Sequence, residues 1–205
     1  TTQVYANSHK IDVKISLLPP WIYTSGDKCT TGPICDSINH IGKSSSLNLD
    51  IKTLPITQTN TAVYEGKLGL AFFPKSDAFK KFYIPIGEVY KYKIGYYHKN
   101  IGADLFPCTT SKSPHKDPKK EYVEASSIRR CFHLLTTKKV SSVLLSDLEL
   151  KNIFKKNPEF KIGKFQSVKD QTIWLYVNKN LKPEAVQAIK DQYKTINSLK
   201  LQDKY

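Results

Sequence analysis

The sequence contains no methionine, only two arginines and no long apolar run. A helix needs ~18 apolar residues to cross a bilayer, and the longest apolar stretches here have the length of one buried strand. We therefore expect no transmembrane segment. The chain also lacks internal repeats and low-complexity tracts. With 205 residues, 40% of them hydrophobic, it is long enough to bury the core of one large domain or two small lobes.

The absence of methionine extends to position 1, which indicates a processed chain. Removal of a signal peptide is the simplest explanation, and an expression-tag scar is the alternative. The sequence thus predicts a periplasmic or secreted protein.

The four cysteines include no CxxC pair, and no histidine pairs with a cysteine or an acid at metal-ligand spacing. We expect no metal and no cofactor. In an exported chain, four cysteines favour disulfides, and Cys29 and Cys35 are spaced for a small closed loop. Four cysteines allow three pairings, which the sequence alone leaves open. We predict Cys29–Cys35 together with Cys108–Cys131.

The formal charge of +14 makes nucleic acid a partner to consider. Most of the excess is lysine spread along the whole chain. Arginine, the preferred residue for recognising phosphates and bases, occurs only at Arg129 and Arg130. Dispersed lysine is typical of a solvated surface, so we expect no nucleic-acid partner. Weak attraction to anionic membranes or cell-wall polymers fits the charge better.

Sequence motifs of common enzymes are missing: there is no GxSxG, no HExxH and no P-loop. Cysteine nucleophiles are disfavoured if the thiols are bonded to one another. We predict that the protein is not an enzyme. A secreted enzyme or toxin is the alternative, and it would need a convergent acid, base and nucleophile that the sequence does not show.

Hydrophobic periodicity predicts alternating strands and helices. Strands are expected over 10–18, 47–55, 68–74, 89–98, 140–145 and 172–177. Helices are expected over 34–41, 59–65, 128–137, 147–154 and from Pro183 to 199, with one helical turn over 77–82. Residues 100–120 are expected to form a loop. This order predicts an α/β fold with a largely parallel sheet.

Four stretches carry a family resemblance: PPWIY at 19–23, GPICDSINHI at 32–41, EGKLGLAFFPKSDAFKKFYIPIGEVY at 65–90, and VSSVLLSD at 140–147 followed by TIWLYVNKNL at 172–181. Their order and spacing resemble family 3 of the periplasmic solute-binding proteins, whose best-known members bind polar amino acids. The resemblance covers most of the chain, and residues 100–125 match poorly.

The resemblance implies a periplasmic binding protein-like type II fold, with a ligand cleft between two lobes. Residues 1–95 would form lobe 1, residues 96–180 lobe 2, and residues 181–205 a helix returning to lobe 1. The implied protein is an exported monomer that captures a small molecule for an ABC transporter permease. The alternative is the same fold used as a sensor or interaction module that lacks amino-acid binding.

The resemblance also implies which residues contact the ligand, and each has a structural alternative. Trp21 and Tyr23 could instead be core aromatics, and Lys75 could be a surface lysine. Asp36 lies near the expected start of a helix, where a negative charge is stabilising without any ligand. A helix N-cap equally explains the polar residues expected in lobe 2. Phe72 should point into the core, opposite Phe73. The implied ligand-binding residues are Trp21, Tyr23, Phe73, Lys75, Ser126, Ser127 and Asp147.

The chain departs from the family where an arginine holds the ligand's α-carboxylate. Phe79 lies at about that position, and Gly69 replaces an acid of the third strand. Lys75 or Lys80 could approach, but a lysine lacks the planar fork that makes two charge-assisted hydrogen bonds. We therefore predict that free α-amino acids bind weakly or not at all. The cleft would take a solute with a flat apolar part against Trp21 and Phe73, or none.

Overall fold

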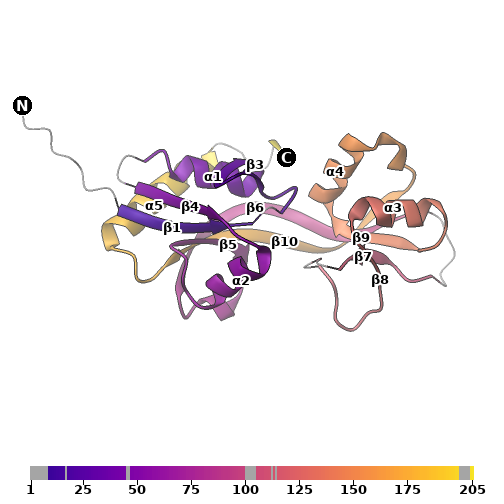
Figure 1. Ribbon diagram of the computed structural model, residues 1–205, viewed down its shortest axis with the longest axis horizontal. Helices are drawn as coiled ribbons and strands as arrows, with labels where there is room; N and C mark the ends of the chain where they lie inside the picture. Colours follow the sequence, from indigo (N-terminus) through magenta and orange to yellow (C-terminus); the bar gives the residue numbers. More distant parts are fainter. Residues whose placement is uncertain are drawn as a thin grey trace, which may run out of the picture. The chain divides into compact units, whose positions relative to one another are not determined.

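The computed structural model describes residues 9–16, 18–44, 47–99, 105–111, 113, 115–198 and 204–205. The chain forms two compact units: Thr1–Lys91 with Thr172–Tyr205, and Tyr92–Gln171. The structure thus divides the chain at 91/92 and 171/172, where the sequence interpretation placed lobe boundaries at 95/96 and 180/181. Two long strands, β6 (Tyr83–His98) and β10 (Lys164–Asn178), each contribute to both units (Figure 1).

The first unit contains a parallel strand pair, β1 (His9–Ile15) and β4 (Leu47–Thr53). Ile11, Val13 and Ile15 are buried while Asp12 between them is exposed, as the alternating sequence predicts. A short hairpin of β2 (Tyr23–Ser25) and β3 (Lys28–Thr31) follows. β5 (Leu70–Pro74) pairs antiparallel with β10.

Three helices belong to this unit: α1 (Pro33–Ile41), α2 (Ile56–Tyr64) and α5 (Pro183–Ser198), with a short 3-10 helix η1 (Asp77–Phe79). α1 and α5 pack together, and His40 Nε2 lies 2.7 Å from Thr195 Oγ1 (Figure 1). Pro183 opens α5 as predicted, and Ile189 and Ile196 are buried. Leu199, expected in the same apolar stripe, lies outside the described residues.

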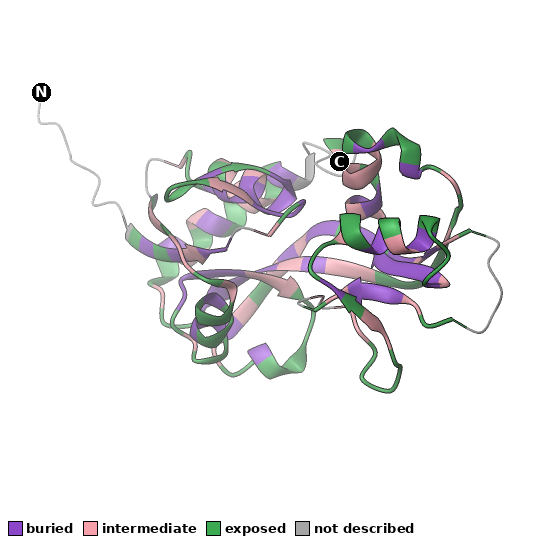
Figure 2. Cartoon of the chain, turned by 45° about the vertical axis from the view of Figure 1, so that its right-hand side comes forward, coloured by how far each residue is buried: buried purple, intermediate pink, exposed green. Residues whose placement is uncertain are grey.

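The second unit is built around β9 (Ser142–Ser146), all of whose residues are buried (purple in Figure 2). β9 pairs antiparallel with β6 and parallel with β7 (Cys108–Thr110), which pairs parallel with β8 (Val123–Ala125). Helices α3 (Ile128–Thr136) and α4 (Asp147–Lys156) and the 3-10 helix η2 (Pro158–Phe160) pack on this sheet. Their core includes Tyr97, Phe132 and Leu145.

Several details of the sequence interpretation are wrong. The six-stranded sheet, in the order β5-β10-β6-β9-β7-β8, is mixed rather than largely parallel, because the long strands pair antiparallel with β5 and β9. The predicted loop over 100–120 contains β7, which is too short to leave a periodic signal. The hairpin over 23–31 was not predicted either. Ser146, not Asp147, is the N-cap of α4.

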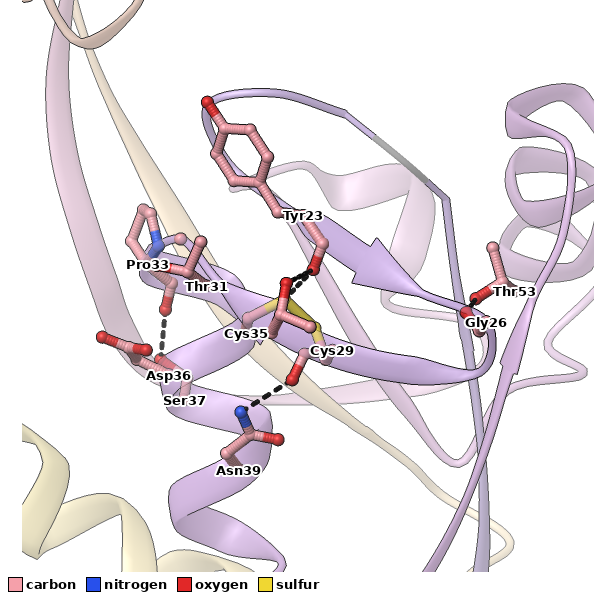
Figure 3. The surroundings of a disulfide bond; sticks show 12 residues. Tyr23, Gly26, Cys29, Thr31, Pro33, Cys35, Asp36, Ser37, Asn39 and Thr53 are labelled. Carbon is pink, nitrogen blue, oxygen red and sulfur yellow. Dashed lines mark hydrogen bonds between the residues drawn. A yellow bond between two sulfur atoms is a disulfide. The ribbon is translucent and has the colours of Figure 1, made fainter. Parts of the chain in front are cut away.

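Two disulfides join strands to helices, and they are the predicted pairs. Cys29–Cys35 ties β3 to the first turn of α1 (Figure 3), and Cys108–Cys131 ties β7 to α3. All four cysteines are described, and none is free. Within the described ranges, the helices are too short or too polar to cross a bilayer.

Candidate functional site

The first unit contains a cavity of about 80 Å³ with mainly apolar walls. It lies just beyond the carboxyl end of β1 and beside α2, the position where open α/β sheets commonly bind ligands. Ile15, Leu18 and Ile22 form one side, and Ile56 of α2 with Phe73 of β5 forms another. All lining residues belong to the first unit. This cavity is the candidate site.

A tight turn before β5 fixes the strand that closes the cavity. Asn178 donates its side-chain amide to the carbonyl oxygens of Gly66 (2.7 Å) and Leu68 (2.9 Å). Gly69 donates its backbone N–H to the carbonyl oxygen of Asp12 at 2.8 Å. A Cβ atom at Gly69 would lie 2.4 Å from the Cγ2 atom of Ile11. The missing side chain therefore lets β5 approach β1 closely, and an acid does not fit there.

Two buried hydroxyl groups place polar atoms in the mainly apolar lining of this cavity. Ser16, after β1, donates a hydrogen bond of 2.8 Å to Thr59 Oγ1 in α2. The two residues are only 5% and 8% exposed, and both line the cavity. Because Thr59 accepts the Ser16 proton, its own hydroxyl proton can be donated to a ligand acceptor. The cavity thus suits a ligand with an apolar group and one acceptor.

Phe73 lines this cavity, and its ring centroid lies 5.3 Å from that of Phe79. Phe72 was expected to point into the core, but it is half-buried and also lines the cavity. Successive side chains of a strand point to opposite faces. Phe72 pairs with the fully buried Leu175 of β10 and Phe73 with Trp174. The opposite orientation of the two side chains stays a prediction.

The two aromatic residues after the Pro-Pro step differ in burial. Trp21 is only 5% exposed, and its ring meets that of Tyr90 edge-on, with centroids 5.8 Å apart. This burial supports the core alternative for Trp21. Tyr23 is half-buried in β2, and its ring points away from the Cys29–Cys35 disulfide (Figure 3). Neither residue is among those that line the cavity.

The basic residues near the expected carboxylate clamp have other contacts. Lys75 Nζ lies 4.6 Å from the ring centroid of Trp174, a cation–π contact. Lys80 Nζ pairs with Asp77 at 2.8 Å, and this pair raises the pKa of Lys80. Phe79 is buried in an aromatic cluster with Phe73 and Tyr176. No guanidinium group belongs to this part of the first unit, because the only arginines are in α3.

The predicted ligand-binding residues of the second unit lie at the starts of helices. Ser127 is the N-cap of α3, and its Oγ accepts a hydrogen bond of 3.2 Å from Arg130 N, while Ser126 is exposed. Asp147 is the first residue of α4, and its Oδ1 accepts hydrogen bonds from Lys93 N (3.1 Å) and Leu148 N (2.9 Å). These contacts give Ser127 and Asp147 structural roles.

Asp36 also has partners within the first unit. Its carboxylate accepts a hydrogen bond of 2.8 Å from the Tyr205 hydroxyl and pairs with Lys204 Nζ at 2.5 Å. The Tyr205 hydroxyl in turn accepts the backbone N–H of Gly32 at 3.1 Å. These contacts tie the end of the chain to the start of α1, and they support the structural role expected for Asp36.

Sequence reasoning missed the cavity residues Ser16, Leu18, Ile22 and Thr59. The available signal was Ser16, a small polar residue directly after a buried strand, where ligand sites concentrate. Thr59 gave no signal of its own, because a threonine within a short helix is ordinary on an exposed face. Only the packing of α2 against β1 brings the two hydroxyl groups together.

The two-unit α/β architecture, with two strands continuing through both units, is the type II periplasmic binding protein fold. No protein-family model matches the sequence. No curated protein matches it either. The likeness to known proteins therefore lies in the fold and not in the sequence.

Solved structures with this fold include ligand-binding cores and transporter components. The GluR0 ligand-binding core, solved with L-glutamate, shares 15% identity with a TM-score of 0.68, and 95% of this chain and 94% of that chain are covered. The second substrate-binding domain of a putative amino acid ABC transporter from Streptococcus pneumoniae shares 17% identity (TM-score 0.66, coverage 97% and 99%). The L-cystine solute receptor of Neisseria gonorrhoeae, unliganded and open, shares 16% (TM-score 0.63, coverage 96% and 89%). These matches confirm the resemblance at the level of the fold.

Proposed function

We propose that this protein is an exported solute-binding protein whose apolar cavity in the first unit receives part of a small molecule. The observation that supports it most is the cavity itself, whose mainly apolar wall contains the Ser16–Thr59 hydroxyl pair. Its position beyond the carboxyl end of β1, in a fold shared with substrate-binding domains, supports the proposal. The two disulfides fit an oxidising compartment such as the periplasm or the extracellular space.

The solute we propose has an apolar group and is not a free polar amino acid. The family's arginine clamp is replaced by Phe79, which is only 6% exposed. The lysines nearest to it, Lys75 and Lys80, contact Trp174 and Asp77. Losing one partner of a buried charge pair typically costs about 2–5 kcal/mol of binding free energy. Free α-amino acids should therefore bind weakly or not at all.

Thermal unfolding against a panel of solutes tests the proposal. A ligand present at about 100 times its Kd stabilises the folded state by about 2.7 kcal/mol, which is a clear shift in Tm. We expect apolar solutes with one acceptor to raise Tm, and the polar amino acids to leave it unchanged. Micromolar binding of any free amino acid, measured by calorimetry, would contradict the expected ligand class.

A blocking variant connects binding to the cavity. Ile56 is half-buried at the start of α2 and lines the cavity, so Ile56→Trp should fill the space and abolish the Tm shift. Thr57→Trp is the matched control, because Thr57 is exposed and does not line this cavity. Equal loss of binding in both variants would place the ligand elsewhere.

The further role we propose is delivery of the solute to an ABC transporter permease, with the protein acting as a monomer and not as an enzyme. A sensor or interaction module is the second candidate. It is favoured by Trp21, the residue expected to stack on a ligand, which instead packs on Tyr90. Absence of any stabilising solute in the panel would favour this second function.

A further inference from the structure

A second, larger cavity of about 460 Å³ lies wholly within the second unit. Tyr97 of β6 and Leu145 of β9 belong to the core under α3 and α4. Because side chains alternate along a strand, Tyr96 and Leu144 point to the opposite face of the sheet. Both line the second cavity. Figure 1 shows α3 and α4 on one side of β9 and the segment between β7 and β8 on the other.

Residues 115–122, which precede β8, supply one wall of this cavity and are held by contacts within the second unit. Lys116 Nζ donates to the carbonyl oxygen of Ser111 at 2.9 Å and forms an ion pair with Glu124. Asp117 donates its backbone N–H to the Tyr122 hydroxyl at 3.3 Å. These contacts join Lys116 to Ser111 after β7 and to Glu124 of β8, and Asp117 to Tyr122. The wall is therefore positioned by the protein itself and does not depend on a ligand.

The lining of this cavity combines apolar side chains with polar groups. Ile94, Leu144 and Val168 supply apolar surface. Above them, the hydroxyl oxygens of Tyr96 and Tyr122 lie 3.4 Å apart. The apolar side chains suit the apolar body of a ligand, and the two phenols suit a hydrogen-bond acceptor.

Positive charge predominates around the opening. Lys120 Nζ lies 5.6 Å from the ring centroid of Tyr96, and the exposed Lys169 forms no ion pair within the described part of the chain. Lys116 is already paired with Glu124, and Asp117 is the one acid among the lining residues. Lys120 and Lys169 together carry one more charge than Asp117 neutralises, and one ligand carboxylate would balance that excess.

His115 adds a buried side chain to the wall. Its side chain is only 4% exposed, and its Nε2 atom lies 3.4 Å from the Glu149 carboxylate. The imidazole lines the cavity, and within the described residues its Nε2 atom makes no hydrogen bond. The cavity is thus built partly from buried groups and is not only a surface cluster of lysines.

We propose that the second cavity binds a small organic anion: a single carboxylate on an apolar body. The apolar body would lie on Ile94, Leu144 and Val168. The carboxylate would face Lys120 and Lys169 and accept one hydrogen bond, from the phenol whose proton is not used between Tyr96 and Tyr122. This site is separate from the cavity of the first unit, and neither proposal depends on the other.

The protonation state of Tyr96 agrees with this role. Burial, together with the neighbouring Tyr122 hydroxyl, raises the pKa of Tyr96 well above its usual range. Tyr96 therefore remains a neutral donor at neutral pH, when a carboxylate ligand is fully ionised.

Calorimetry with three probes of similar size tests the charge requirement. Benzoate carries the anion, benzyl alcohol is neutral and benzylamine is a cation. We expect benzoate to bind at least about tenfold more tightly than either of the others. Equal affinity of benzoate and benzyl alcohol, or no heat with benzoate at millimolar concentration, would refute the proposal.

Matched variants locate the binding. The double variant Lys120→Glu with Lys169→Glu should weaken benzoate by about tenfold or more. The control pair Lys155→Glu with Lys161→Glu changes the net charge equally at exposed positions outside the cavity, and should change affinity by less than about twofold. Similar weakening in both pairs would mean general charge attraction and would overturn the site.

Two more variants separate the two cavities. Val168 is 57% exposed, so Val168→Trp should block the second cavity and abolish benzoate binding without loss of folding. Ile56→Trp, which blocks the first cavity, should leave benzoate affinity unchanged. The reverse pattern would place benzoate in the first unit, contradicting this inference while supporting the first cavity as a ligand site.

Discussion

The backbone N–H of Gly69 donates a hydrogen bond to the carbonyl oxygen of Asp12 across 2.8 Å. A Cβ atom at this glycine would lie 2.4 Å from Ile11 Cγ2 and 3.1 Å from the same carbonyl oxygen. Ile11 is fully buried and cannot move aside freely. The glycine therefore allows the close approach of β5 to β1.

We expect Gly69→Ala to destabilise the protein by about 1–3 kcal/mol, because the added methyl group overpacks the contact with β1. Gly42→Ala is the control, since its nearest neighbour would be a side-chain carbon at 3.3 Å and its φ is −67°. Urea unfolding followed by circular dichroism measures both. A Gly69→Ala protein as stable as the Gly42→Ala protein would show that the strands separate easily.

The Glu149 carboxylate should make the second unit sensitive to acid. It accepts hydrogen bonds from Ser146 N (2.7 Å) and Ser146 Oγ (2.8 Å) and lies near His115. Burial alone would raise the pKa of Glu149, but the contact with His115 and the bonds from Ser146 lower it overall. A lowered folded-state pKa stabilises the protein above the unfolded-state value of ~4.3, and this stability is lost as pH falls through the folded-state pKa.

Glu149→Gln should accordingly cost about 1–3 kcal/mol of unfolding free energy at neutral pH. The cost should shrink as pH falls below the unfolded-state value of ~4.3, because the unfolded chain then binds a proton that the folded carboxylate does not yet bind. Denaturant unfolding at a series of pH values measures this, with the exposed acid in Glu159→Gln as control. A cost that does not change with pH would mean that the charge of Glu149 contributes nothing.

The two disulfides should contribute unequally to stability. Cys108–Cys131 closes a loop with a sequence separation of 23, against 6 for Cys29–Cys35. In the chain-entropy model the longer loop contributes about 1 kcal/mol more. We expect Cys108→Ser with Cys131→Ser to lower Tm more than Cys29→Ser with Cys35→Ser. Thiol titration of the denatured, unreduced protein should find no free thiol, and two or more would disprove the pairing.

Helix α5 should be required for the first unit to fold. Ala185, Ile189 and Ile196 are buried, and Tyr193 donates its hydroxyl to the carbonyl oxygen of Glu88 at 2.8 Å. Each fully buried large apolar side chain contributes about 1.5–3 kcal/mol, and total stability is about 5–15 kcal/mol. A chain ending at Leu181 should lose cooperative unfolding.

Ile189→Ala provides the milder test of the same packing. The isoleucine is fully buried, so we expect a cost of about 2–5 kcal/mol with unfolding still cooperative. Lys190→Ala, at the exposed neighbouring position, should have little effect. A truncated chain that melts as sharply as the full chain would refute the placement of α5.

Local patterns predicted much of the fold. Strict alternation over His9–Ile15 and Leu47–Thr53 placed β1 and β4, and the apolar stripe of α1 placed Ile34, Ile38 and Ile41 in the core. Ser127 and Pro183 marked helix starts correctly. These features depend on neighbours in sequence, which is why a single sequence reveals them.

Strand pairing and the candidate sites needed more than sequence. The short strands β7 and β8 have three residues each, too few for a periodic signal. The antiparallel pairing of β10 with β5 joins residues about a hundred positions apart, and nothing in either segment specifies that partner. Trp21 shows the same limit, because its residue type suits a ligand contact and a core position equally.

The sequence by itself determined the α/β class and the lack of an arginine clamp, because these depend on residue type and local spacing. It left three cysteine pairings open, and the structure decided between them. Only the tertiary structure decided that Ser16 meets Thr59 in one cavity, and that Lys120 lies over Tyr96 in another. Cavities form where distant segments fail to fill the space between them. That depends on the packing of whole side chains, which the order of residues along the chain does not display.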